Sequence, residues 1–203
     1  ENRERCTRKL KELPSLRSTG KGAHKFSAVL VPLCHVEGEL SLLYTLRTSD
    51  LRSHRREVSF PGGKADPSDE SLIHTALRET EEEIGVGSER VDVWGTLPPQ
   101  MGKGGKSSIV GVLGYVGHVD SESFRLNPRE VESIFAVALK NLSHPHNCRQ
   151  TQFRSDVFKS GYTLPIFIGS EPKIWGLTAV ITHLTLSALL PGIYKHRLSH
   201  ITI

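Results

Sequence analysis

The sequence predicts an α+β fold in which helices form a sandwich around a mixed β-sheet. Short apolar, β-branched segments come first along the chain, an amphipathic helical pattern occupies the middle, and further strand-like segments precede a strongly apolar helix. The 203 residues contain no repeat and no clear linker, which suits a single domain with additions. We expect a basic N-terminal extension over 1–25 and one domain over 26–203.

The first elements are a surface helix and a hairpin. A short helical pattern lies near the N-terminus within the basic extension. FSAVLVPL (26–33) is apolar and β-branched, as expected of a buried strand. ELSLLYTLR (39–47) follows it after Glu37 and Gly38, a pair that suits a tight turn between two strands.

A third strand, a loop and a helix follow. EVSF (57–60) is a short strand, and PGGKADPSD (61–69) has the Gly, Pro and Asp content of a loop. A helix is predicted from about Asp69 to Ile84, with Ser68 or Asp69 as its N-cap and Gly85 as its stop.

The C-terminal half alternates strands with a loop before a last helix. LTAVITHLTLSALL (177–190) is apolar around most of its surface and predicts a buried helix that Pro191 and Gly192 end. The other expected elements are strands at 91–97, 109–117 and 133–139, a polar loop at 141–150 and a strand at 161–168.

Composition limits the function only loosely. The formal net charge of +4 fits an anionic ligand, but nucleic acid or an acidic membrane would explain it equally well. No apolar run reaches about 18 residues, so we expect no transmembrane helix. Basic and aromatic residues do not interleave as in RNA-binding proteins. Three cysteines without CxxC spacing indicate reduced thiols in an intracellular protein.

The helix in the middle of the chain carries an unusual concentration of acids. At about 100° per residue, one stripe faces the sheet, and Glu79, Glu82 and Glu83 cluster on another face that water reaches. The residues of the packed stripe are Ile73, Ala76, Leu77, Thr80 and Ile84. Carboxylate oxygens are the ligands that hard divalent cations prefer, so a metal site is one interpretation and a solvated acidic face is the other.

Two observations favour the metal site. The acids lie near the C-terminal end of the helix, where the helix dipole disfavours negative charge. The helix is also preceded by Phe60-Pro61-Gly62-Gly63, a turn whose backbone can approach a metal ion or a phosphate closely.

These residues carry a resemblance. FPGGKADPSDESLIHTALRETEEEIGV (60–86) resembles the signature of the Nudix hydrolases. The matching positions are Gly63, Glu70, Arg78, Glu79, Glu82, Glu83, Gly85 and Val86. Two positions depart from that signature: one extra residue lies between Gly63 and Glu70, and Thr80 replaces an aliphatic residue.

The resemblance implies a Nudix-type α/β/α sandwich and a role for each acid. The family hydrolyses a diphosphate linked to another group with Mg²⁺ or Mn²⁺. It implies that Glu79 and Glu83 are the main metal ligands and that Glu82 is a further ligand or the catalytic base. Gly63 would offer its carbonyl. Arg78 and Glu70 would hold the loop and helix together.

The segment before the helix narrows the resemblance. LLYTLRTSDLRSHRREVSFPGG (42–63) resembles a motif of the coenzyme A diphosphatase branch, with Arg56 where glycine is usual. The matching residues are Thr45, Arg47, Arg52, Val58, Phe60, Pro61, Gly62 and Gly63. Further blocks between about 28 and 182 resemble a mitochondrial member of this branch, which implies a mitochondrial location.

The implied reaction cleaves coenzyme A or acyl-coenzyme A into 3′,5′-ADP and phosphopantetheine or its acylated form. Guanidinium groups bind phosphates in two-point fashion, so Arg47, Arg52 and Arg56, together with Gly62, are the expected substrate contacts. Glu130, and after it Glu132, is a candidate for an additional base or metal ligand. The alternatives are a Nudix hydrolase for ADP-ribose, a dinucleotide or another nucleotide, and a catalytically silent binding module.

Overall fold

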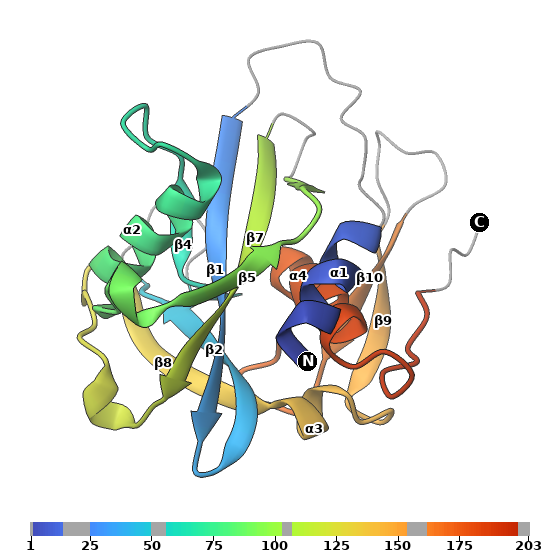
Figure 1. Ribbon diagram of the computed structural model, residues 1–203. Coiled ribbons are helices and arrows are strands. Elements are labelled where there is room, and N and C mark those ends of the chain that lie inside the picture. The colour runs from blue at the N-terminus through green and yellow to red at the C-terminus, as the bar shows by residue number, and fades with distance from the viewer. Residues whose placement is uncertain (1, 14–24, 50–55, 103–106, 154–161, 199–203) are drawn as a thin grey trace.

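The computed structural model of the chain describes residues 2–13, 25–49, 56–102, 107–153 and 162–198 (Figure 1). The α-helices of the described residues are α1 (Asn2–Glu12), α2 (Leu72–Ile84), α3 (Leu139–Leu142) and α4 (Gly176–Leu189), and the short 3-10 helices are η1 (Ser88–Arg90) and η3 (Ser121–Ser123). The strands are β1 (Lys25–Val36), β2 (Glu39–Arg47), β3 (Val58–Ser59), β4 (Gly62–Lys64), β5 (Asp92–Thr96), β6 (Gln100–Met101), β7 (Ser107–His118), β8 (Val131–Ala138), β9 (Cys148–Phe153) and β10 (Tyr162–Phe167).

The main sheet is mixed, as the sequence predicts. Strand β1 runs parallel to β7, whereas the other pairs of the sheet are antiparallel. The order along the sheet is β3-β2-β1-β7-β5, with β4 also beside β1, β6 beside β7 and β8 beside β2. A separate antiparallel pair joins β9 to β10. Because β1 and β2 pair only near their turn, the segment with β3 and β4 fits between their other ends.

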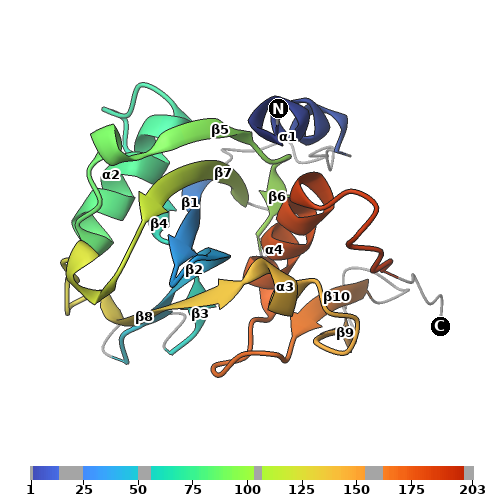
Figure 2. The ribbon, with the colours of Figure 1, turned by 60° about the horizontal axis from the view of Figure 1, so that its bottom comes forward.

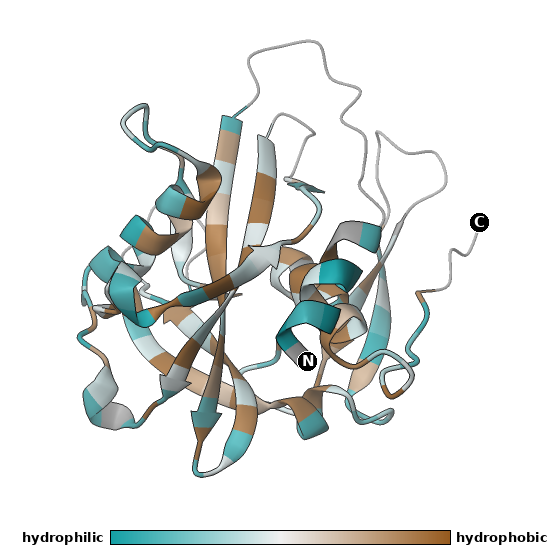
Figure 3. Cartoon of the chain, in the orientation of Figure 1, coloured by the Kyte–Doolittle hydropathy of each residue, from teal (hydrophilic) through white to brown (hydrophobic). Residues whose placement is uncertain are grey.

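Helices cover both faces of this sheet. Figures 1 and 2 show α2 on one face and α4 with α1 on the other. Each face has its own hydrophobic core, and the core on the α4 side is the larger one. The apolar character of α4 and the polar outer surface of α1 are visible in Figure 3. The predicted α/β/α sandwich is therefore confirmed.

Strand β1 shows how the sequence supplies both cores. Ala28 and Leu30 face α2, while Val31 and Leu33 face the α4 side, and all four are fully buried. A central strand buried on both faces has a continuous apolar sequence rather than an alternating one. The turn from β1 to β2 has positive φ at Glu37 and Gly38, +50° and +81°, as a tight hairpin requires.

Helix α2 ends where predicted and begins later than predicted. Gly85 adopts the left-handed conformation (φ +71°) and its N–H donates to the carbonyl of Glu81. The N-cap is Ser71, whose hydroxyl accepts from the backbone N–H of His74. The expected caps Ser68 and Asp69 are wrong because the Asp69 carboxylate bonds to the side chains of Thr75 and Arg78 instead.

Two predicted loops contain strands. Gly62–Lys64 pairs with Ser27–Val29 of β1, and Cys148–Phe153 pairs with β10. Turn-forming composition suggested a loop at 61–69, but glycine is required at Gly62 because a Cβ there would lie 2.4 Å from the carbonyl oxygen of Ala28. The start of β9 was missed because its residues are mostly polar and half exposed.

Helix α1 contributes to the larger core. Cys6 and Leu10 are buried, 1% and 3% exposed, and the helix contacts β5 and α4. The remaining cysteines, Cys34 and Cys148, are also buried, and all three are free thiols, as predicted. Among the described residues, no helix is long and apolar enough to cross a membrane.

An aromatic stack supports the glycine turn before α2. The rings of Tyr44 on β2 and Phe60 stack with their centroids 4.7 Å apart. The Tyr44 hydroxyl lies 3.1 Å from Thr182 Oγ1 of α4, which connects β2 to the helix on that face. The carbonyl of Pro61, which follows Phe60, accepts a hydrogen bond from the Leu30 N–H at 2.8 Å. These contacts hold the Pro61-Gly62-Gly63 backbone against β1.

Candidate active site

Helix α2 presents its three central acids to three different environments. Glu82 is exposed, Glu79 is partly buried, and Glu83 is buried with 1% of its surface exposed. The prediction that water reaches all three is therefore wrong for Glu83. The structure buries Glu83 because other segments of the chain, which helical periodicity alone does not reveal, cover that edge of the helix.

Two donors from different elements bind the buried carboxylate. The Gly62 N–H donates to Glu83 Oε2 at 3.2 Å, and Arg47 Nη1 lies 3.4 Å from Glu83 Oε1. Arg47 is the last residue of β2, so the sheet fixes its position. Its Nε is buried and has no hydrogen-bond partner among the described residues. A buried N–H without an acceptor is costly, so this guanidinium is prepared to receive an anionic oxygen.

The glycines before α2 are required by close contacts. A Cβ at Gly63 would lie 2.4 Å from the Glu79 carboxylate. Because only glycine leaves this space free, the Glu79 carboxylate lies directly against the turn. Predicted contacts Gly62 and Gly63 therefore lie beside predicted acids Glu83 and Glu79, respectively.

Arg78 connects the acids to the loop that precedes α2. Its Nε and Nη2 bond to the two oxygens of Asp69 at 2.9 and 3.0 Å, a two-point pair. The same guanidinium lies 3.1 Å from Glu79 and 3.3 Å from Glu82. These bonds hold the pKa of Asp69 well below its usual range, first through Arg78 and then through the Asp66 N–H.

Asp69, rather than Glu70, holds the loop and the helix together. Glu70 is exposed, and its predicted role is wrong. The sequence contains the signal that identifies Asp69. The Nudix pattern has five free positions after its glycine and then a glutamate; Lys64 to Ser68 fill the five positions after Gly63, so Asp69 occupies the place of that glutamate. The extra residue therefore lies between Asp69 and Arg78, not in the loop before them.

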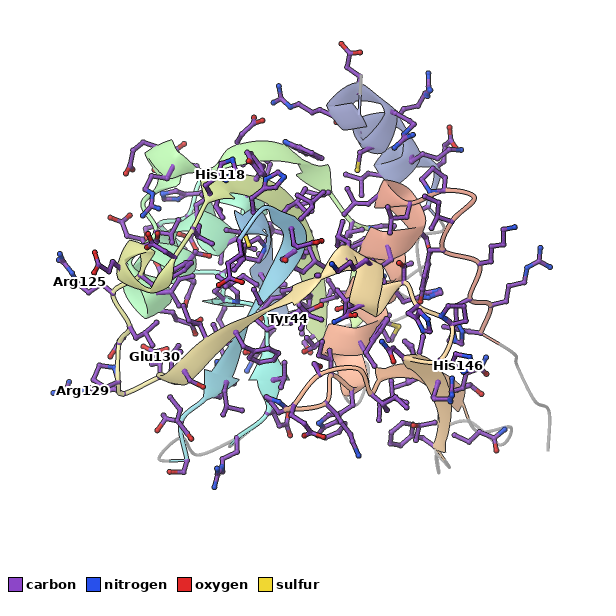
Figure 4. The ribbon with its side chains drawn as sticks, turned by 90° about the horizontal axis from the view of Figure 1, so that it is seen from below. Tyr44, His118, Arg125, Arg129, Glu130 and His146 are labelled. Atoms are coloured by element: carbon purple, nitrogen blue, oxygen red, sulfur yellow. The ribbon has the colours of Figure 1, made fainter. Side chains whose placement is uncertain are left out.

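Glu130 lies near the acids of α2, and its charge contributes to the raised pKa of both Glu79 and Glu83. Its backbone carbonyl accepts from the Thr48 N–H at 3.0 Å, and its Oε1 accepts from Asn127 Nδ2 at 3.3 Å. The Asn127 N–H in turn donates to the Glu83 carbonyl at 2.9 Å. Figure 4 shows Glu130 just before β8, next to Arg129.

The surroundings of Glu83 and Glu79 disfavour the charged forms of both carboxylates. Burial raises the pKa of Glu83 to about 7, and the charges of Glu130 and Glu79 add to the rise, while Gly62 and Arg47 oppose it. Burial also raises the pKa of Glu79, against the effect of Arg78. A bound cation would relieve both effects.

The donor set fits a hard divalent cation. It consists of carboxylate oxygens beside a backbone turn, which such cations prefer over nitrogen or sulfur. As the side chains lie, no three acidic, histidine or cysteine groups of the described residues converge on one point, because the glutamates bond to arginines. The expected convergence of the three carboxylates is therefore wrong for this arrangement.

Of the two other arginines predicted to contact substrate, the structure describes Arg56 but not Arg52. Arg52 falls outside the described residues. Arg56 is described: its backbone has φ +53° and its N–H donates to the Arg47 carbonyl at 3.1 Å. Its guanidinium is 69% exposed and lies 3.8 Å from Glu132. The positive φ explains why glycine suits this position.

Comparison with known proteins identifies the family. The sequence profile described as NUDIX domain matches residues 24–156, more than half of the chain. The chain belongs to the Nudix family. This confirms the predicted Nudix hydrolase, a member of a family that generally depends on divalent metal ions.

Several curated Nudix relatives align along most of the chain. It is 47% identical over 98% of its length, and 93% of the relative's, to mitochondrial coenzyme A diphosphatase NUDT8 of Mus musculus. The corresponding Homo sapiens protein is 46% identical over 87% of this chain and 74% of its own. Nudix hydrolase 3 of Caenorhabditis elegans is 38% identical, with coverages of 87% and 78%.

Solved Nudix structures resemble this one less closely. A Nudix hydrolase from M. smegmatis, RenU, is 22% identical with a TM-score of 0.49 and covers 62% of this chain and 80% of its own. The Ap4A hydrolase of C. elegans in a binary complex is 21% identical with a TM-score of 0.47, with coverages of 58% and 82%.

Proposed function

We propose that this Nudix protein hydrolyses the diphosphate bond of coenzyme A or acyl-coenzyme A to 3′,5′-ADP and phosphopantetheine or its acylated form. The observation that carries the proposal is the 47% identity, along nearly the whole chain, to a protein named coenzyme A diphosphatase. Because the alignment covers 98% of this chain, it includes the segment 42–63 with Arg47 and the glycine turn. That relative's name also supports a mitochondrial location.

The proposed metal is Mg²⁺ or Mn²⁺. Glu79 and Glu83 would hold it, with Glu82 as a further ligand or as the base and the Gly63 carbonyl as a backbone ligand. When bound, such an ion neutralises charge on the diphosphate and lowers the pKa of bound water. The raised pKa values of Glu83 and Glu79 support this assignment, because a cation stabilises their charged forms.

The chain's own groups orient the substrate and handle the proton. The Arg47 Nε–H, which lacks an acceptor among the described residues, donates to a diphosphate oxygen. In the reaction a water oxygen bonds to one phosphorus, the bridging P–O bond breaks, and the water proton passes to a carboxylate. Exposed Glu82 is the proposed acceptor, and Glu130 is the second candidate.

Product analysis tests the proposal. Coenzyme A is incubated with the protein and Mg²⁺ or Mn²⁺, and the products are separated by chromatography. We expect 3′,5′-ADP and phosphopantetheine. Hydrolysis of ADP-ribose without any action on coenzyme A would instead identify another Nudix substrate class.

We further propose that 26–203 forms the catalytic domain and that 1–25 is a basic segment preceding it. The NUDIX profile supports the start of this domain near residue 24. The contacts of α1 with β5 and α4 indicate that the preceding segment contributes to stability as well.

A further inference from the structure

Arg56 has a backbone conformation that an arginine adopts only at a cost. Its φ of +53° lies in the left-handed region, where the Cβ of an L-residue crowds the following carbonyl oxygen. Glycine has no Cβ and adopts this conformation without that crowding. Strained residues cluster at active sites and ligand-binding sites, so the contacts of Arg56 are informative.

The backbone contacts of Arg56 do not explain why this residue is an arginine. Its N–H donates to the Arg47 carbonyl, and the Arg47 N–H donates to the Glu57 carbonyl, both at 3.1 Å. These bonds continue the pairing of β2 with β3, and any residue other than proline can make them.

The side-chain contacts do not explain the arginine either. The guanidinium is 69% exposed, and the nearest described carboxylate, Glu132, lies 3.8 Å away. That distance is longer than a hydrogen bond allows, and an exposed ion pair of this kind contributes little to stability. Among the described residues, no contact of the fold offsets the strain.

The position of Arg56 relates it to the candidate active site. Its backbone partner Arg47 extends its own guanidinium to Glu83. Two cations therefore lie at one end of β2: the partly buried Arg47 beside the acids and the exposed Arg56 on the neighbouring segment. A substrate whose diphosphate lies at Glu83 and Arg47 would bring its other anionic groups toward this exposed cation.

We propose that Arg56 binds a phosphomonoester outside the diphosphate, which in coenzyme A is the 3′-phosphate, and thereby selects substrates that carry it. This inference rests on the proposed function. A guanidinium donates two parallel hydrogen bonds to a phosphate, and its charge complements the second negative charge of a phosphomonoester. The positive φ sets the direction in which the side chain leaves the backbone, so the strain is retained with the contact.

The experiment compares coenzyme A with 3′-dephospho-coenzyme A. The ratio of their kcat/KM values is measured for the wild type, Arg56→Gly and Arg56→Ala. Both variants lose the guanidinium, but only glycine removes the strain. We expect the ratio to fall about tenfold in both variants, which corresponds to a partly solvated phosphate contact. We expect Tm to be about 2 °C higher for Arg56→Gly than for Arg56→Ala.

Glu37 provides a matched control. It is the other described non-glycine residue with positive φ, +50°, and it lies in the turn between β1 and β2. Glu37→Gly removes similar strain at a site without a phosphate contact. It should raise Tm like Arg56→Gly and leave the substrate ratio unchanged.

The other possible outcomes would overturn either the assignment of Arg56 alone or the proposed function as well. Equal losses for both substrates, or no loss for either, would overturn the assignment of Arg56 while the coenzyme A activity stands. A wild type that cleaves both substrates equally well would do the same. A wild type that cleaves neither would overturn the proposed function and this inference together.

Discussion

Glu83 is a carboxylate with almost no contact with water, and its neighbours explain how the fold holds it. The Gly62 N–H and Arg47 provide partial compensation, yet burial still raises its pKa to about 7. A buried acid with a raised pKa and a nearby cation is typical of a functional site rather than of a structural ion pair. Its role should therefore appear in activity more than in stability.

Replacement of the acids by amides tests this at the level of single residues. We expect Glu83→Gln and Glu82→Gln each to lower hydrolysis at least about 100-fold, because the neutral amide neither holds a cation nor accepts a proton. Tm without added metal should stay within about 5 °C, since the amide keeps the shape of the side chain. Steady-state turnover and thermal unfolding measure both quantities. Exposed Glu81→Gln on the same helix is the control, and near-normal turnover in both variants would refute the mechanism.

The pair of Asp69 and Arg78 gives a second residue-level prediction. Asp69→Asn removes the negative charge to which the Arg78 guanidinium is bonded. We expect Arg78 to shift toward Glu79 and Glu82 as a result. We expect a loss of stability, seen as a decrease of about 5 °C in Tm, together with reduced turnover. Differential scanning calorimetry gives the first value. Glu70→Gln should change neither, and if Glu70→Gln has the larger effect, the assignment to Asp69 is incorrect.

At the scale of elements, helix α4 and the segment after it share a buried polar contact. Tyr194 OH lies 2.8 Å from His183 Nδ1 and 3.5 Å from Cys148 Sγ of β9. Burial lowers the pKa of His183 to about 4, and the charge of His196 adds to this effect. The contact joins α4, β9 and the C-terminal segment, and burial favours the neutral form of His183 at this place.

This contact predicts a loss of stability in acid. An unfolded histidine binds a proton near pH 6.5, whereas folded His183 does so near pH 4. The unfolded state thus binds more protons between these values, and the free energy of unfolding falls as pH decreases from about 6.5 to about 4. His183→Asn should remove this part of the decrease in Tm between pH 7.5 and 4.5. His146→Asn, at an exposed histidine, should not. An identical decrease in all three proteins would contradict the prediction.

Local signals predict the elements well where they are strong. The apolar runs of β1, β2 and α4 and the glycine end of α2 are found within a few residues of their expected positions. The strand at Gly62–Lys64 and the burial of Glu83 were not predictable this way, because both depend on pairing with β1 and β2, which are distant in sequence. Turn-rich or acidic composition dominates the local signal there. Counting from Gly63, in contrast, does identify Asp69.

At the scale of the whole molecule, α1 belongs to the larger core although it precedes the NUDIX match. Leu10 is 3% exposed, and Leu→Ala at such a site costs about 2–5 kcal/mol. We expect Leu10→Ala to lower Tm by about 5–15 °C, and Arg8→Ala, on the exposed face of the same helix, to leave it within about 1 °C. Thermal unfolding monitored by circular dichroism measures both. An unchanged Tm for Leu10→Ala would mean that α1 is not part of the folded unit.

The two cores lie on opposite faces of one sheet, and the acids of α2 lie on the face with the smaller core. Substitutions in the larger core can therefore change stability without altering residues that contact the acids. Natural selection or protein engineering could therefore raise the thermal stability of this enzyme by substitutions in the larger core. The Tyr44 and Phe60 rings would have to remain stacked, since they support the glycine turn.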